Sequence, residues 1–271
     1  MTVERFFELF LLELKSNSKL RTYYRFLNNM SRFEFRKAYF QQRLQYIIDN
    51  IPDKSVDVWD CGCGYGTTGL FLAMNGIKSQ GTTLEFYHKE IAERLNFWTQ
   101  YGDTSLFSYS YENLFDALPA DASKDLVILQ DTLHHLEPLE KAVQILNRVL
   151  RKEGKLIVVE ENGNNIIQNL KLFLRRGNKK IIEVYDEKLQ KKFLLGNENI
   201  RSLKQWKSEL SKESFIVNDS KTEYIRVFPP FLFNNQNTES IVGKEQIISK
   251  TKPFLKEYFF FGINFIAEKS N

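Results

Sequence analysis

The chain has 271 residues, of which 42% are hydrophobic and 27% charged, and its formal net charge is +4. This length allows one large core, or one core with a cap. No stretch approaches the roughly eighteen apolar residues of a membrane span, and glutamates interrupt the apolar N-terminal segment, so we expect neither a transmembrane segment nor a signal peptide. Cys61 and Cys63 are the only cysteines, and their spacing predicts neither a disulfide nor a metal site. A cytoplasmic location is the default expectation.

The N-terminal residues 1–50 have apolar and aromatic side chains at helical spacing, and residues 21–27 and 32–44 interleave aromatic residues with arginines. Such interleaving also occurs on surfaces that stack on nucleic-acid bases. We favour helices whose aromatic side chains face inward and whose arginines face outward, and we expect no nucleic-acid partner.

A glycine-rich turn follows the first apolar strand. Val56, Val58 and Trp59 are apolar, Asp60 comes next, and three glycines at 62, 64 and 66 then occupy every second position before a helical pattern begins near Thr67. A strand, a tight glycine turn and a helix bring the backbone close to a nucleotide-like cofactor. The free N–H groups of the helix point at whatever lies in the turn.

Two cofactors compete for this turn. The spacing Gly64-x-Gly66-x-x-Gly69 matches the dinucleotide fingerprint of nicotinamide-dependent oxidoreductases. The spacing Asp60-x-Gly62-x-Gly64-x-Gly66 resembles motif I of class I S-adenosylmethionine (SAM) methyltransferases. A carboxylate at Asp60 would repel a pyrophosphate but suits the ammonium and sulfonium of SAM. We therefore favour SAM, with an oxidoreductase and a non-catalytic SAM-binding protein as alternatives.

The resemblance extends over about residues 45–161. Strands are predicted at 79–84, 125–130 and 156–160, with a helix at 139–150 and the sequence Leu-His-His-Leu-Glu-Pro between them. This stretch is similar to small-molecule methyltransferases, including the quinone-biosynthesis C-methyltransferase group. The resemblance implies a Rossmann-like α/β fold with a mostly parallel sheet whose last strand is antiparallel. It also implies a helical cap at residues 1–50, which we expect to be separable from the core, and a methyltransferase domain at 51–271 with a cap insertion at about 163–200.

The resemblance also implies which residues hold SAM. Glu85 would bind the ribose hydroxyls, and Phe86 would lie against the adenine. The acid that meets the adenine amino group has no clear match, so either Glu112 or the backbone of Tyr111 serves. The full expected set is Asp60, Cys61, Gly62, Gly64, Gly66, Glu85, Phe86, Tyr111, Glu112, Gln130 and Asp131.

Methyl transfer needs a base only when the acceptor must lose a proton. His134 and His135 follow the strand that ends at Gln130 and are the candidates, unless they only tie the loop to the next helix. Asp131 with residues 160–162 loosely resembles the Mg²⁺ site of catechol O-methyltransferase, but we expect no metal. Residues 131–134 lack the Asn/Asp-Pro-Pro-aromatic tetrad of nucleic-acid amino-methyltransferases.

The second half predicts helices at 164–176 and 180–193. The first is apolar nearly all round, so we expect it to be buried or packed on the cap. Ser202 is the predicted N-cap of a helix at 203–210. Strands are predicted at 215–217, 223–228 and 258–267, with a helix from 244 that ends at Pro253.

Charge is unevenly distributed. The net charge is +4 for residues 1–50, −6 for 51–160 and +5 for 171–192. The basic segments are either solvated helix faces or a rim that attracts an acidic small molecule, an acidic carrier protein or anionic lipid, so peripheral membrane contact stays open. The many aromatic residues of both cap segments favour a small apolar or aromatic acceptor, with oxygen as the expected acceptor atom. The sequence leaves the oligomeric state open.

Overall fold

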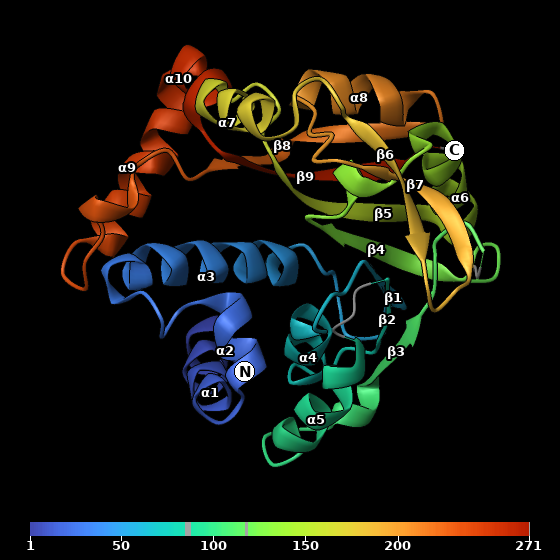
Figure 1. Cartoon of the computed structure of the whole chain (residues 1–271), viewed down its shortest axis with the longest axis horizontal. Coiled ribbons are helices and arrows are strands. Elements are labelled where there is room, and N and C mark those ends of the chain that lie inside the picture. Colours follow the sequence, from blue (N-terminus) through green and yellow to red (C-terminus); the bar gives the residue numbers. More distant parts are fainter. Residues whose placement is uncertain (85–87, 117–118, 271) are drawn as a thin grey trace.

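The computed structural model describes residues 1–84, 88–116 and 119–270. Its centre is a seven-stranded sheet in the order β3-β2-β1-β4-β5-β9-β8 (Figure 1). All neighbouring strands run parallel except β9, which is antiparallel to both β5 and β8. This confirms the predicted Rossmann-like fold. The strands are β1 (Val58–Cys61), β2 (Ser79–Thr83), β3 (Phe107–Tyr111), β4 (Lys124–Gln130), β5 (Leu150–Glu161), β8 (Phe215–Ile225) and β9 (Gly262–Lys269).

Alternate residues of the central strands pack into two different cores, as expected for a sheet covered on both faces. Trp59 and Val127 join one core with α6 (Leu139–Val149) and α8 (Leu203–Ser211). Val58 and Leu126 join the other core with α3 (Phe33–Asp49) and α4 (Thr67–Ala73). Ser202 caps α8 in a full capping box, as predicted.

A third core joins the N-terminal helices to the sheet. Phe6 and Phe10 of α1 (Val3–Ser16) are fully buried in a cluster that includes Phe71 of α4 and Trp98 of α5 (His88–Trp98). The short helix α2 (Ser18–Tyr24) joins them. Because this core is shared, we expect residues 1–50 to fold together with the rest of the chain, and Figure 1 shows these helices beside α4 and α5.

The segment predicted as a helix at 180–193 is instead an antiparallel hairpin of β6 (Ile181–Asp186) and β7 (Lys191–Gly196). The helix prediction was wrong because exposure alternates along β6, from Ile181 to Tyr185, with the two-residue period of a strand. The connection contains no glycine, proline or asparagine; the side chain of Asp186 accepts the N–H groups of Lys188 and Leu189, and Gln190 takes a positive φ of 54°.

The helix predicted at 164–176 exists as α7 (Ile166–Arg176), but of the two expectations for it, burial is wrong: only Leu172 of this helix is buried. The two strands predicted at 215–228 form the single strand β8, with an irregularity between Asn218 and Glu223. Residues 258 and 259, predicted as strand, end α10 (Pro253–Phe259), which follows α9 (Thr238–Thr251). Among the described residues, no helix is long and apolar enough to cross a membrane.

Candidate cofactor and acceptor site

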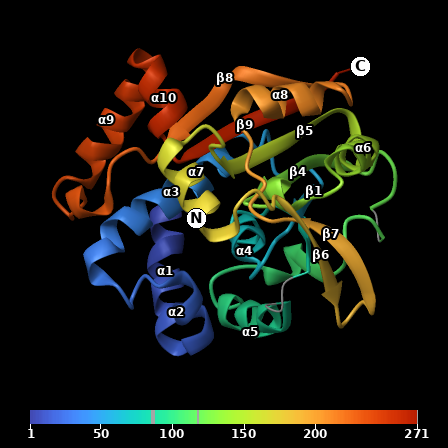
Figure 2. The same ribbon diagram turned by 45° about the horizontal axis from the view of Figure 1, so that its top comes forward.

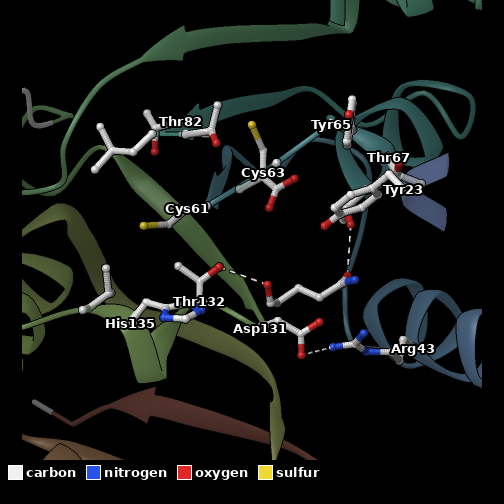
Figure 3. A pocket seen from close by; sticks show the side chains of 18 of the residues that line it. Tyr23, Arg43, Cys61, Cys63, Tyr65, Thr67, Thr82, Asp131, Thr132 and His135 are labelled. Carbon is white, nitrogen blue, oxygen red and sulfur yellow. Dashed lines mark hydrogen bonds and ion pairs between the residues drawn. The ribbon is translucent and has the colours of Figure 1, made fainter. Parts of the chain in front are cut away.

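A cavity of about 730 Å³ lies at the carboxyl ends of β1, β2 and β4. The glycine turn forms one wall, and helices α2 and α3 with the end of the hairpin form the others (Figure 3). Ligands of open parallel sheets bind at this edge, where the strand order reverses between β1 and β4. The cap segments therefore meet the glycine turn around one cavity.

The glycine turn has a conformation that requires glycine. Gly62, Gly64 and Gly66 have φ angles of 87°, 53° and 73°, which other residues rarely adopt. A Cβ added at Gly62 would lie 2.2 Å from the Thr132 hydroxyl, whereas one at Gly64 would meet no atom within 4 Å. The turn therefore packs against the sheet on one side and opens to free space on the other, as a cradle for a ligand would.

Asp60 is 2% exposed and lines the cavity. Burial raises the pKa of Asp60 to about 7, and the N–H of Gly69 partly opposes that shift. Its Oδ2 atom has no hydrogen-bond partner within the described part of the chain. A buried carboxylate oxygen without a partner is costly. Its place at the cavity wall therefore fits a cationic ligand such as the ammonium of SAM.

Most of the other predicted SAM residues surround the same space. Glu112 directly follows β3, lines the cavity and donates its N–H to the Thr83 carbonyl at 3.2 Å. Tyr111 is absent from the cavity wall, since its hydroxyl donates to Asp186 of the hairpin at 2.6 Å. Cavity-lining residues from the predicted set are Asp60, Cys61, Gly62, Gly64, Glu112, Gln130 and Asp131. Glu85 and Phe86 lie outside the described residues, and Gly66 closes the turn behind the cavity, where an added Cβ would lie 2.7 Å from Phe107.

Asp131 connects the sheet to the cap. It follows β4 with a φ of 52° and forms an ion pair with Arg43 of α3 (Figure 3). Burial would raise the pKa of Asp131, but the Arg43 guanidinium holds it below its usual value. Both charged residues line the cavity, and their ion pair fixes α3 over the end of β4.

The two histidines have different surroundings. The ring of His134 lies with Nδ1 2.5 Å from Glu160 Oε2, and the residue is 2% exposed and is not part of the cavity wall. Burial would lower the pKa of His134, but Glu160 raises it to about 9. The ring is therefore protonated near neutral pH and has no lone pair with which to accept a proton.

His135 lines the cavity, and its Nδ1 lies 2.7 Å from the carbonyl oxygen of Gly196. A carbonyl only accepts hydrogen bonds, so Nδ1 of His135 must carry the hydrogen. In the neutral ring, Nε2 is then the basic nitrogen. Of the two predicted candidates, the geometry gives only His135 the position of a base.

Sequence reasoning missed several residues of the cavity wall. Arg226 follows β8 with a φ of 69° and stacks 4.5 Å over the ring of Tyr39. Glu245 of α9 fixes this turn by accepting the N–H groups of residues 226–228 at 2.7 to 3.4 Å. The sequence marked Tyr39 as one of the cap aromatics that favour an apolar acceptor, but it gave no signal for Arg226, because the two residues are far apart in the chain.

The residues considered for Mg²⁺ have other partners. Glu160 binds His134, and the Asn162 side chain donates to the carbonyls of Glu257 and Phe260 at 2.8 and 2.9 Å. These contacts give Glu160 and Asn162 a structural role.

Comparisons with known proteins agree with the cavity. The family model described as "Methyltransferase domain" matches residues 59–158, from β1 to β5. A search of curated proteins gives no significant match. The cofactor of this domain is SAM, which fits the cradle at Gly64 and the unpartnered oxygen of Asp60. No comparison singles out the quinone-biosynthesis group, so that similarity stays a prediction.

Solved structures share the fold at low identity. A SAM-dependent methyltransferase from Methanosarcina mazei is 18% identical with a TM-score of 0.55, covering 82% of this chain and 96% of that chain. Phosphoethanolamine N-methyltransferase 2 of Haemonchus contortus, solved with SAM, is 16% identical with a TM-score of 0.56. The match covers 84% of this chain and 52% of that chain. The [4+2]-cyclase SpnF is also 16% identical with a TM-score of 0.56. The match covers 85% of this chain and 82% of that chain.

Proposed function

Since the chain carries a SAM-dependent methyltransferase domain, we propose that it methylates an oxygen of a small apolar or aromatic molecule that bears an acidic group. The observation that carries this proposal is the composition of the cavity wall outside the glycine turn, which contains many aromatic rings and arginines. Its members are Tyr23, Tyr24, Phe26, Arg32, Phe35, Arg36, Tyr39, Phe40, Arg43 and Phe193.

Two of these arginines favour an acidic acceptor. Arg36 donates to the backbone carbonyl of Arg25 at 2.5 Å, and no ion pair joins Arg32 or Arg36 to a carboxylate within the described chain. Burial and the neighbouring charges of Arg32 and Arg25 lower the pKa of Arg36. Like charges held together beside a cavity are stabilised by an anion, and guanidinium groups bind carboxylates and phosphates in a bidentate geometry.

The proposed role of His135 is to accept the proton of the acceptor hydroxyl. Its Nε2 is the basic nitrogen, and the Gly196 carbonyl stabilises the Nδ1–H as the ring becomes positively charged. SAM, when bound, supplies a methyl group on a sulfonium. The chain's part is to align the acceptor between the glycine turn and His135 and to exclude water, which the aromatic wall does.

We also propose a cytoplasmic setting, because both cysteines are free and buried. The neighbour named as a [4+2]-cyclase shows that the fold alone does not fix the reaction. For that reason the acceptor has to be tested directly.

The test incubates the purified protein with methyl-labelled SAM and three acceptor sets: hydroxylated aromatic acids, their esters and aromatic amines. Release of S-adenosylhomocysteine and the mass of the product are measured. Turnover should require the hydroxyl and be fastest with the free acids. Arg32→Gln combined with Arg36→Gln should raise KM for the acid by about tenfold or more, as expected when charged hydrogen bonds are lost, with SAM affinity unchanged.

Arg5→Gln is the matched control, because Arg5 is an exposed arginine of α1 that pairs with Glu8 outside the cavity. Methylated amines as the only products would overturn the oxygen assignment. Equal KM values for acids and esters would overturn the acidic acceptor. SAM binding without any product, including with cell extract as the acceptor source, would instead favour a non-catalytic SAM-binding protein.

A further inference from the structure

Helix α7 turns its apolar side toward solvent. The α7 apolar face consists of Ile166, Ile167, Leu170, Phe173 and Leu174, which are 52%, 43%, 58%, 56% and 76% exposed. At 3.6 residues per turn these five positions fall within one arc of about 120°. Leu172, on the other side of the helix, is 4% exposed and attaches α7 to the protein. In Figure 2, α7 is drawn in front of α3.

Both ends of α7 are held in place, so its outward face is not the result of a loosely attached helix. The side chain of Asn165 caps the helix by accepting the Gln168 N–H at 2.7 Å and donates to the Phe259 carbonyl of α10 at 2.8 Å. At the other end, Arg176 donates to the Glu198 carbonyl at 3.1 Å and Arg175 pairs with the Glu198 carboxylate at 3.3 Å.

Basic residues surround this apolar face. Residues 166–181 include Lys171, Arg175, Arg176, Lys179 and Lys180 and no acidic residue. An exposed apolar stripe with lysines and arginines beside it is the composition of helices that lie in a membrane interface. An 11-residue helix is about 16 Å long, whereas a bilayer core is about 30 Å thick. The helix is therefore long enough to lie flat and too short to span.

We propose that the α7 apolar face docks on the surface of an anionic lipid bilayer. Charge complementarity argues for lipid over a second copy of the chain. In a two-fold dimer each patch would meet itself, and the basic residues around α7 would then face one another. An anionic headgroup layer instead attracts Lys179 and Lys180, which form no ion pair within the described residues, whereas Arg175 is already paired with Glu198. This inference does not depend on the identity of the methyl acceptor.

The β6–β7 hairpin, which lies in the same insertion as α7, contributes Phe193, Leu194 and Leu195 to the cavity wall. Leu194 and the hairpin residues Ile181 and Tyr185 are also 43% to 51% exposed. Docking through α7 would therefore hold one wall of the cavity close to the lipid.

The test is sedimentation of the full chain with phosphatidylglycerol vesicles and, in parallel, with phosphatidylcholine vesicles. The protein should bind the anionic vesicles more tightly and lose binding as salt is raised. Leu170→Ser combined with Leu174→Ser should weaken binding about tenfold to a hundredfold, because two side chains no longer leave water. Lys179→Gln combined with Lys180→Gln should weaken binding to the anionic vesicles about tenfold.

Ile216→Ser is the matched control. Ile216 is 64% exposed, and its partner Glu268 pairs with Lys155, in the middle of β5, away from the end of that strand that leads to α7. This variant should bind vesicles as the wild type does, and all variants should keep the wild-type unfolding midpoint because only exposed side chains change. No binding to the anionic vesicles at low salt would overturn the proposal. So would equal binding by the Leu170/Leu174 variant, or a dimer that this variant converts to a monomer in light scattering.

Discussion

Asp60 is held as a buried carboxylate with one oxygen unpaired in the described chain, and its chemistry should control SAM binding. Asp60→Asn is expected to weaken SAM binding by about 1.5–3 kcal/mol, or roughly tenfold to a hundredfold, because a charged hydrogen-bond partner is lost. Calorimetric titration measures this change. Asp53→Asn is the control, since Asp53 caps Ser55 in an exposed loop before β1.

The same residue predicts a pH dependence. The pKa of Asp60 is raised to about 7, so its carboxyl is increasingly neutral below that pH and then attracts a cation less. SAM affinity of the wild type should fall as the pH drops from about 8 to about 6, and the slope should vanish in Asp60→Asn. A slope that persists unchanged in this variant would assign the titration to another group.

Substitutions of His134 and His135 should have different effects, one on stability and the other on turnover. His135→Gln is expected to lower kcat by about 10²–10⁴-fold with SAM affinity unchanged, because the proton acceptor at the cavity wall is lost. His134→Gln should instead lower the free energy of unfolding by about 3–5 kcal/mol, because Glu160 keeps a buried charge without its partner. Urea denaturation and single-turnover rates distinguish the two effects. Unchanged turnover in His135→Gln would mean that alignment alone drives transfer.

The pH dependence of stability follows from the same ion pair. The pKa of His134 is about 9 in the folded protein, above the value of about 6.5 for an unperturbed histidine. The stabilisation is therefore fully present below about pH 6.5 and is lost as the pH rises through about 9. In His134→Gln the free energy of unfolding should no longer fall as the pH rises from about 6.5 to about 9.

At the scale of elements, a buried ion pair joins α1 to α5. Arg94 donates to both carboxylate oxygens of Glu13 at 2.8 Å, and Trp98 donates to the same carboxylate at 3.0 Å. Glu13→Ala should therefore destabilise the protein by about 3–5 kcal/mol in urea denaturation, because the Arg94 charge stays buried. The control Glu8→Ala breaks the exposed pair with Arg5 and should cost less than about 1 kcal/mol. Similar losses in the two variants would contradict the buried pair.

The β6–β7 hairpin positions His135 through Gly196. A Cβ added at Gly196 would lie 2.0 Å from the backbone oxygen of His134, so Gly196→Ala must move the hairpin end or the histidine loop. We expect kcat to fall by about a hundredfold, as for a small misplacement of a catalytic group, while the Kd of SAM changes little. Gly243→Ala in α9 is the control, because no atom lies within 4 Å of the added Cβ, and this variant should retain activity. If both variants keep wild-type kcat, the hairpin does not position the base.

Local signals explain which elements could be predicted from the sequence. The strand, glycine turn and helix from β1 to α4 are marked by residues adjacent in the chain, and so are the cap of α8 at Ser202 and the apolar strands β4 and β5. The hairpin was missed because residues 187–190 have no glycine, proline or asparagine to mark a turn. The outward direction of α7 depends on α10, which follows almost eighty residues later, so periodicity could show that the helix is apolar but not which way it faces.

The cavity was predictable only on its cofactor side for the same reason. The spacing of Asp60 and the glycines in the sequence identifies them as cofactor-binding residues. Arg226 enters the wall through a turn that Glu245 of a later helix fixes, and the difference between His134 and His135 depends on Glu160 and Gly196. Such contacts join residues that lie far apart in the sequence, and no local pattern encodes them.

At the scale of the whole molecule, the three cores share elements. Helix α3 packs on the sheet and also joins the N-terminal core, and α4 does the same. Deleting residues 1–45 is therefore expected to leave an insoluble or unfolded chain, measured by circular dichroism and by recovery in the soluble fraction. A truncated protein that folds and binds SAM would instead show that the N-terminal helices are a separable cap.

The position of β9 has a consequence for biosynthesis. This strand is the last regular element of the chain, yet it lies inside the sheet between β5 and β8. While the ribosome is still translating residues 262–269, the edges of β5 and β8 therefore have no partner to close them. Unpaired edges can pair with other chains, so the nascent chain is most prone to aggregate between the synthesis of β8 and the pairing of β9 with it. Slowed translation of the codons for residues 226–261, when β8 exists and β9 does not, should accordingly lower the soluble yield far more than the same slowing within α3, before β5 and β8 are made.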